Sequence, residues 1–209
     1  MSYDPIPAAG AGAQLFDQPS LFYLTNRELI EEWHGLQSKV VEGLNEWYST
    51  TLREALQVPA ESLELVVSLA KGPQSWRHVV LHPAEATILG DKPVIGVGLA
   101  WPSKSANPSA DSVFACVRCS RNQTGKMASA AFLEAGGQAL RSSIPGNRGA
   151  NDPTWPIWRW IRSDANWWTD LDHYRDQIVS DITDLARAVI EPLRIASTTP
   201  IVGDPDETE

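Results

Sequence analysis

The sequence is poor in the residues that build cross-links and membrane spans. It has two cysteines in 209 residues, and two cannot make the disulfide framework of a secreted protein. Its apolar runs stay well short of the ~20 residues needed to cross a bilayer, and its start lacks the basic and apolar regions of a secretory signal. These features predict a cytoplasmic protein with no membrane partner.

Basic side chains are also in short supply. The chain has 17 Lys and Arg against 26 Asp and Glu, which gives a net charge of −9. Residues 171–209 alone hold nine acidic and three basic side chains, whereas residues 59–127 hold seven basic and five acidic ones. The overall balance disfavours wholesale nucleic-acid binding and favours solubility, although it leaves a mildly basic middle segment.

The motifs of the common enzyme classes are missing from the sequence. It contains no G-x-x-x-x-G-K-[ST], G-x-G-x-x-G, G-x-S-x-G or H-E-x-x-H, the patterns that bind phosphates, dinucleotides, acyl groups and zinc. Cys116 and Cys119 form an isolated C-x-x-C, and on a strand these positions point to opposite faces, so they cannot complete a four-ligand zinc site. We expect no cofactor, no bound metal and, on balance, no catalysis.

What the sequence does contain is a clear succession of helix and strand patterns. Residues 1–20, rich in Pro, Gly and Ala, predict a flexible lead-in, residues 21–197 a single domain and residues 198–209 an acidic flexible tail. Thr25 and Glu28 match a capping box. The apolar residues that follow predict a helix ended by Pro59 and roughly 48 Å long, at ~1.5 Å per residue.

Four segments rich in β-branched and aromatic residues come next, at 63–69, 76–82, 93–101 and 112–119, and the short connections between them favour antiparallel pairing. A helix over 127–143, a strand over 155–161 and a last helix capped by Thr169 with Asp172 complete the order α-β-β-β-β-α-β-α. The predicted fold class is α+β, a mostly antiparallel sheet of about five strands packed by a long N-terminal and a C-terminal amphipathic helix.

The stretch WPIWRWIRSDANWW, residues 155–168, holds five of the nine tryptophans. On a strand, Trp158 and Trp160 would share one face and Arg159 would lie on the other. Three interpretations stay open. The favoured one is core packing; the others are a protein interface, because tryptophan is enriched at hot spots, and a base-stacking platform beside Arg159 and Arg162.

His78 and His82 would point the same way on their strand, beside Trp76 and shortly before Glu85. A four-residue separation spans roughly 13 Å along a strand, too far for the two rings to share one metal ion. A pocket built on these four residues is the enzymatic hypothesis for this chain. Histidines that fill one face of a sheet are the simpler interpretation.

The function predicted from these patterns is a non-catalytic protein-binding module of the immunity, antitoxin, inhibitor or chaperone-like kind, acting through an acidic helical surface and exposed aromatics. The candidate partner-binding residues are Trp158, Arg159, Trp160, Trp33 and Trp47. The long helix also offers a homodimer contact through Trp33 and Trp47.

The alternative is a nucleic-acid-handling, defence- or restriction-associated domain. It requires the basic side chains of the middle and C-terminal segments to share one sheet face with Trp158 and Trp160, so that a positive groove exists despite the negative total. The basic residues concerned are Lys71, Arg77, Lys104, Arg118, Arg121, Lys126, Arg148, Arg159 and Arg162.

Overall fold

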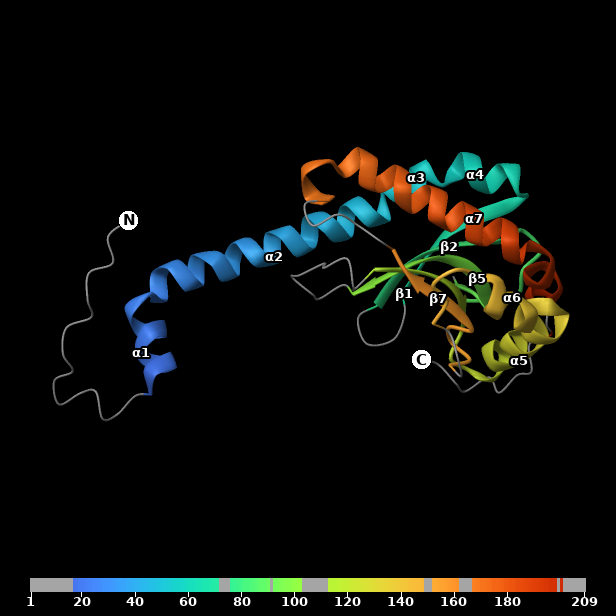
Figure 1. Cartoon of the computed structure of the whole chain (residues 1–209), viewed down its shortest axis with the longest axis horizontal. Helices are drawn as coiled ribbons and strands as arrows, with labels where there is room; N and C mark the ends of the chain where they lie inside the picture. Colours follow the sequence, from blue (N-terminus) through green and yellow to red (C-terminus); the bar gives the residue numbers. More distant parts are fainter. Residues whose placement is uncertain are drawn as a thin grey trace.

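The computed structural model describes residues 17–71, 76–90, 92–102, 113–148, 152–161, 167–198 and 200, and it confirms the α+β fold class (Figure 1). The helical elements are α1 (Gln18–Thr25), α2 (Arg27–Ser49), α3 (Thr51–Ala55), α4 (Gln57–Ser62), α5 (Gln123–Phe132), the π-helical turn Leu133–Gly137, α6 (Gln138–Ser143), the 3₁₀ turn Trp167–Thr169 and α7 (Leu171–Ser197). The strands are β1 (Leu65–Lys71), β2 (Trp76–Pro83), β3 (Ile88–Leu89), β4 (Lys92–Pro93), β5 (Ile95–Pro102), β6 (Phe114–Cys119) and β7 (Ile157–Trp160).

Five strands form one antiparallel sheet in the order β1-β2-β5-β6-β7, as the short connections predict. The sequence did not predict the hairpin β3–β4, which forms a separate two-stranded sheet within the β2–β5 connection. Its strands have two residues each, too few to show an alternating pattern.

Helix α7 covers one face of the sheet, and α3 and α4 lie near it on the same side (Figure 1). Ile178, Ile182 and Leu193 of α7 are fully buried there, in one cluster with strand residues such as Leu99 and Val117. Alternate residues of a strand point to opposite faces. The strand residues that alternate with this cluster therefore form the outer face, defined here as the face turned away from α7.

The outer face carries a second, smaller apolar cluster. Its buried members are Ala100, Phe114 and Cys116, with Trp76, Trp155, Trp158 and Trp160 partly buried against them. Burial on both faces explains why β5 and β6 read as continuous apolar runs rather than as alternating ones.

The N-terminal helix differs from its prediction in where it begins and ends. Thr25 is the last residue of α1 and donates its hydroxyl to the Leu21 carbonyl, while Asn26 precedes α2, so the predicted capping box does not form. Pro59 lies inside α4 instead of ending a helix. It is the third residue of that helix, where the backbone N–H has no acceptor within the helix and its loss costs little.

Helix boundaries elsewhere also shift. Helix α5 begins at Gln123, because the Asn122 side chain accepts the Gly125 N–H, and its continuation is kinked at Gly136, which has a φ of 118°. Asp170, rather than Thr169, caps α7 by accepting the His173 N–H. Residues 1–16 of the predicted lead-in lie outside the described residues, as does most of the predicted tail; Gln18 to Ser20 of the lead-in belong to α1.

Among the helices that the structure describes, none combines the length and the apolar character required to span a bilayer.

Candidate functional site

Of the fourteen large hydrophobic side chains that are exposed in the described part of the chain, seven lie on the N-terminal arm, defined here as α1 and residues 27–43 of α2. Figure 1 shows the arm extending away from the sheet and its covering helices. Four side chains on this part of α2 form the apolar stripe: Leu29, Trp33, Leu36 and Val40 are 47%, 63%, 51% and 52% exposed. They recur at four-, three- and four-residue steps, the spacing that puts side chains on one side of a helix. The stripe is therefore a continuous apolar face that this chain leaves in solvent.

The base of α2 is anchored to the body of the protein. Trp47 stacks on Tyr174 of α7, with ring centroids 6.0 Å apart and 8° between the planes. The buried hydroxyls of Tyr48 and Tyr174 lie 3.3 Å apart, and Asn45 accepts the indole N–H of Trp101 at 2.9 Å. The structure thus separates two predicted partner-binding residues: Trp33 is exposed on the arm, whereas Trp47 is a partly buried anchor.

Trp158 and Trp160 lie together on the outer face. Their ring centroids are 5.1 Å apart in an edge-to-face arrangement, and both rings contact Phe114. Trp155 contacts Phe114 and Trp76 in the same way. Edge-to-face contacts of this kind stabilise the packing of aromatic rings, and this arrangement favours the core-packing interpretation of the tryptophan stretch.

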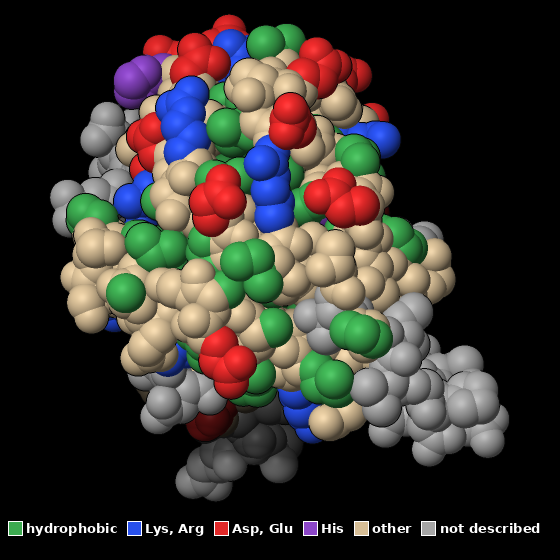
Figure 2. All heavy atoms as spheres, turned by 90° about the vertical axis from the view of Figure 1, so that its right-hand side faces the viewer, with side chains coloured by type: hydrophobic (Ala, Val, Ile, Leu, Met, Phe, Trp, Pro, Cys, Tyr) green, Lys and Arg blue, Asp and Glu red, His purple; other side chains and the backbone are tan. Residues whose placement is uncertain are grey.

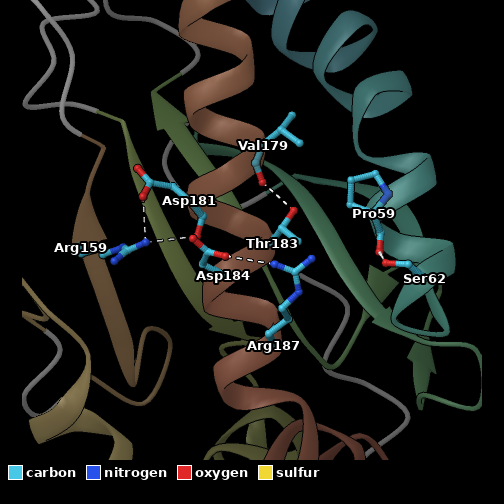
Figure 3. Close-up of polar contacts among 8 residues, drawn as sticks. All are labelled: Pro59, Ser62, Arg159, Val179, Asp181, Thr183, Asp184 and Arg187. Atoms are coloured by element: carbon cyan, nitrogen blue, oxygen red, sulfur yellow. Dashed lines mark hydrogen bonds and ion pairs between the residues drawn. The ribbon is translucent and has the colours of Figure 1, made fainter.

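Arg159 lies on the opposite side of β7 from these two rings. Its guanidinium donates to the Asp181 carboxylate at 2.9 Å and to the Asp181 carbonyl at 3.2 Å, which ties the strand to α7 (Figure 3). The ion pair borders a hollow of about 390 Å³ between the 145–148 turn, β7 and α7. Asp181 neutralises Arg159, and Arg148 is a second basic side chain that lines the hollow.

The 145–148 turn runs along β7, the last strand of the sheet. The Arg148 N–H donates to the Trp158 carbonyl at 2.8 Å, and the Trp158 N–H donates to Asn147 Oδ1 at 3.1 Å. These bonds give the tryptophan strand hydrogen-bond partners on both sides, because β6 pairs with it along the other.

Most of the basic side chains do not gather beside Trp158 and Trp160; among those that the structure describes, Arg148 is the exception, because it lines the hollow with Arg159 and Trp160. Arg118 lies on the outer face but is buried, and it donates to the Pro93 carbonyl. Arg77 and Arg159 lie on the other side of the sheet by strand alternation, Arg121 precedes α5, and Lys126 lies near the start of that helix. Lys104, Arg162 and the side chain of Lys71 lie outside the described residues. This distribution gives little support to a basic sheet face.

His82 and His78 both lie on the outer face and are buried. His82 Nδ1 is 2.9 Å from the Pro83 carbonyl, which can only accept, so this nitrogen carries the proton and Nε2 accepts the Ser68 hydroxyl at 2.8 Å. Burial lowers the pKa of His82. Neither ring nitrogen of His78 has a hydrogen-bond partner among the described residues, and Glu85 is exposed in the following turn.

The Ser68–His82 contact was missed in the sequence because it joins two strands. A serine bonded to an imidazole is the start of a nucleophilic site, but acyl transfer also needs N–H donors placed around the substrate oxygen. The third group here is a backbone carbonyl, not a carboxylate. The structure therefore supports the simpler interpretation of the two histidines, as side chains that fill a sheet face.

Cys116 and Cys119 point to opposite faces, as strand alternation predicts: Cys116 belongs to the outer-face cluster and Cys119 to the main core. Burial raises the pKa of the Cys119 thiol to about 12 and also raises that of Cys116. Because the thiolate is the reactive form, we expect both cysteines to react with an aromatic disulfide reagent at pH 8 far more slowly in the folded protein than in denaturant. Fast labelling of either thiol in the folded protein would contradict this placement.

No group of His, Cys, Asp and Glu able to hold a metal ion occurs within the part of the chain that the structure describes.

Comparison with protein-family models, with curated proteins and with solved structures found no match to this chain.

Proposed function

We propose that this chain is a protein-binding module and that the N-terminal arm is its binding surface. The observation that carries the proposal is the apolar stripe, four large side chains about half exposed or more on a helix that stands away from the body. Contiguous exposed apolar surface of this kind marks interaction sites, and a helix with apolar residues at three- and four-residue steps is a common form of protein recognition. Trp33, the most exposed of the four, is of the type enriched at binding hot spots.

The opposite end of the molecule has a different character. Figure 2 looks at that end and shows acidic and basic side chains interspersed across its upper part, with hydrophobic side chains scattered between them. Mixed charge with isolated apolar groups is typical of a surface that stays in water. The contrast supports the arm as the part of the molecule suited to a partner.

The charges of the arm favour a protein partner over a nucleic acid. The part of α2 that belongs to the arm carries Glu28, Glu31, Glu32 and Glu42 against Arg27 and Lys39. A phosphate backbone would be repelled by this surface, whereas an apolar seam flanked by mixed charges suits another helix.

Affinity capture with a matched pair of variants tests the proposal. Leu36→Glu places a charge in the stripe, and Ser38→Glu places the same side chain two residues away, on the other side of the helix. We expect the wild-type chain and Ser38→Glu to retain the same protein partner, and Leu36→Glu to retain at least ~10-fold less of it, because a charge buried in an apolar contact is costly. Equal retention of every bound protein by all three chains would contradict the proposal.

A further inference from the structure

The apolar stripe has the pattern of a two-stranded coiled coil. Leu29, Trp33, Leu36 and Val40 occupy alternating d and a positions of a seven-residue repeat. Gly43 occupies the next d position, and the following Leu44 (e) and Trp47 (a) are partly buried against the main core. The exposed part thus ends where the body begins, and a second helix can lie along it over about three turns.

The arm needs a partner of some kind to be a stable helix. Residues 31–40 of α2 are all exposed, and helices of this length without packing are marginal in water. Gly35 and Gly43 lower the helix propensity further, and a Cβ added at either would meet no atom within 4 Å. Packing on the stripe is therefore the main source of stability available to this segment.

The sequence of the arm is complementary to itself in the antiparallel direction. If Trp33 packs beside Leu36 of a second copy, Leu29 packs beside Val40 of that copy, and the same contacts repeat by symmetry. Glu32 and Lys39 both occupy g positions, which flank the seam, and g positions face one another in an antiparallel pair. Each Glu32 then lies near Lys39 of the second copy. The dimer therefore has two Glu32–Lys39 ion pairs across the seam, related by symmetry.

A parallel pair lacks this match. There the g positions face e positions, so Glu32 would meet Gln37 and Lys39 would meet Leu44, with no opposite charges across the seam. A self-complementary patch is what a two-fold symmetric interface requires. Binding of an unrelated partner would not require opposite charges to be placed symmetrically about the centre of the apolar stripe, as Glu32 and Lys39 are.

We propose that the occupant of the arm is a second copy of this chain, paired antiparallel through the apolar stripe with Glu32 opposite Lys39. This inference rests on the proposed function, because it names the partner of the same surface. In the dimer the two bodies lie at opposite ends of the paired helices, since each body is joined to the C-terminal end of its own α2.

The test measures the mass of the full chain by sedimentation over a concentration series, with circular dichroism to show that each variant folds. We expect a dimer for the wild-type chain and for Ser38→Glu. Leu36→Glu should weaken dimerisation at least ~100-fold by burying a charge. Lys39→Glu and Glu32→Lys should each weaken it about tenfold, because each replaces two attractive pairs with two repulsive ones.

Mixing the two charge variants tests the direction of pairing. Lys39→Glu carries two acids at the seam and Glu32→Lys two bases, so an equimolar mixture should form a mixed dimer of about wild-type affinity. Failure of the mixture to associate better than either variant alone would overturn the antiparallel arrangement. A dimer insensitive to Leu36→Glu would overturn the inference by placing the contact elsewhere.

A wild-type chain that stays monomeric at all concentrations would also overturn the inference. If that monomer still retains a different protein in affinity capture, and Leu36→Glu does not retain it, the proposed function stands and only the identity of the partner is wrong. If neither self-association nor retention depends on Leu36, both are wrong.

Discussion

Acidification should destabilise this protein through His78. The side chain is 1% exposed, and burial, helped by the nearby positive charge of Arg118, lowers its pKa from 6.5 to about 3. Between these two pH values His78 is protonated in the unfolded chain but not in the folded chain. The contribution of His78 to the free energy of unfolding is therefore fully present above pH 6.5 and is lost as the pH falls. The loss approaches about 1.4 kcal/mol per pH unit below pH 6.5, and it reaches about 3 kcal/mol between pH 7.5 and pH 4.5. The lowered pKa of His82 acts in the same direction.

Urea unfolding at pH 7.5 and pH 4.5 measures this effect. His78→Leu removes the titrating ring and keeps an apolar side chain at the site, so its free energy of unfolding should fall less on acidification than that of the wild-type chain, by about 3 kcal/mol. His34→Leu, at an exposed position of α2, serves as the control and should keep the wild-type dependence. An identical pH dependence in the wild-type chain and His78→Leu would show that the fold does not lower the pKa of His78.

Gly98→Ala should be among the most damaging small substitutions in the chain. Gly98 lies in the middle of β5, opposite Val80 of β2. A Cβ there would lie 1.8 Å from the Val79 carbonyl oxygen, and because that atom belongs to the backbone, no side-chain movement relieves the contact. Strands β2 and β5 must separate locally, which we expect to cost about 3 kcal/mol or more.

Gly35→Ala is the matched control for this substitution. Its added Cβ meets nothing within 4 Å, and alanine has a higher helix propensity than glycine by up to ~1 kcal/mol. Thermal unfolding should therefore give a lower midpoint for Gly98→Ala and an unchanged or higher one for Gly35→Ala. A Gly98→Ala chain as stable as wild type would mean that β2 and β5 pair less closely than the structure shows.

The strands were predictable because their signals are local. Runs of β-branched and aromatic residues separated by turn residues predicted four of the five sheet strands within a few positions, and WPIWRWI predicted the fifth. The break in the N-terminal helix had a signal as well. The apolar step from Trp47 to Leu52 is five residues instead of three or four, and the helix is interrupted at Thr50.

The sequence does not predict which residues of a periodic apolar pattern contact the rest of the chain. Trp33 and Trp47 belong to the same helical stripe, yet one is exposed on the arm and the other stacks on Tyr174. The Ser68–His82 contact depends on the register of β1 against β2. Both outcomes follow from long-range packing, which periodicity does not encode.

The bonds that Asn147 and Arg148 make to Trp158 have a consequence for the behaviour of the sheet at high concentration. An outermost strand with unsatisfied backbone groups is a template on which strands of other molecules can add and aggregate. At β7 the Trp158 N–H and carbonyl are already engaged by the turn, which blocks such growth beside the most aromatic segment of the chain. Strand addition from other molecules is thereby hindered at β7, the edge of the sheet whose aromatic sequence would most favour it.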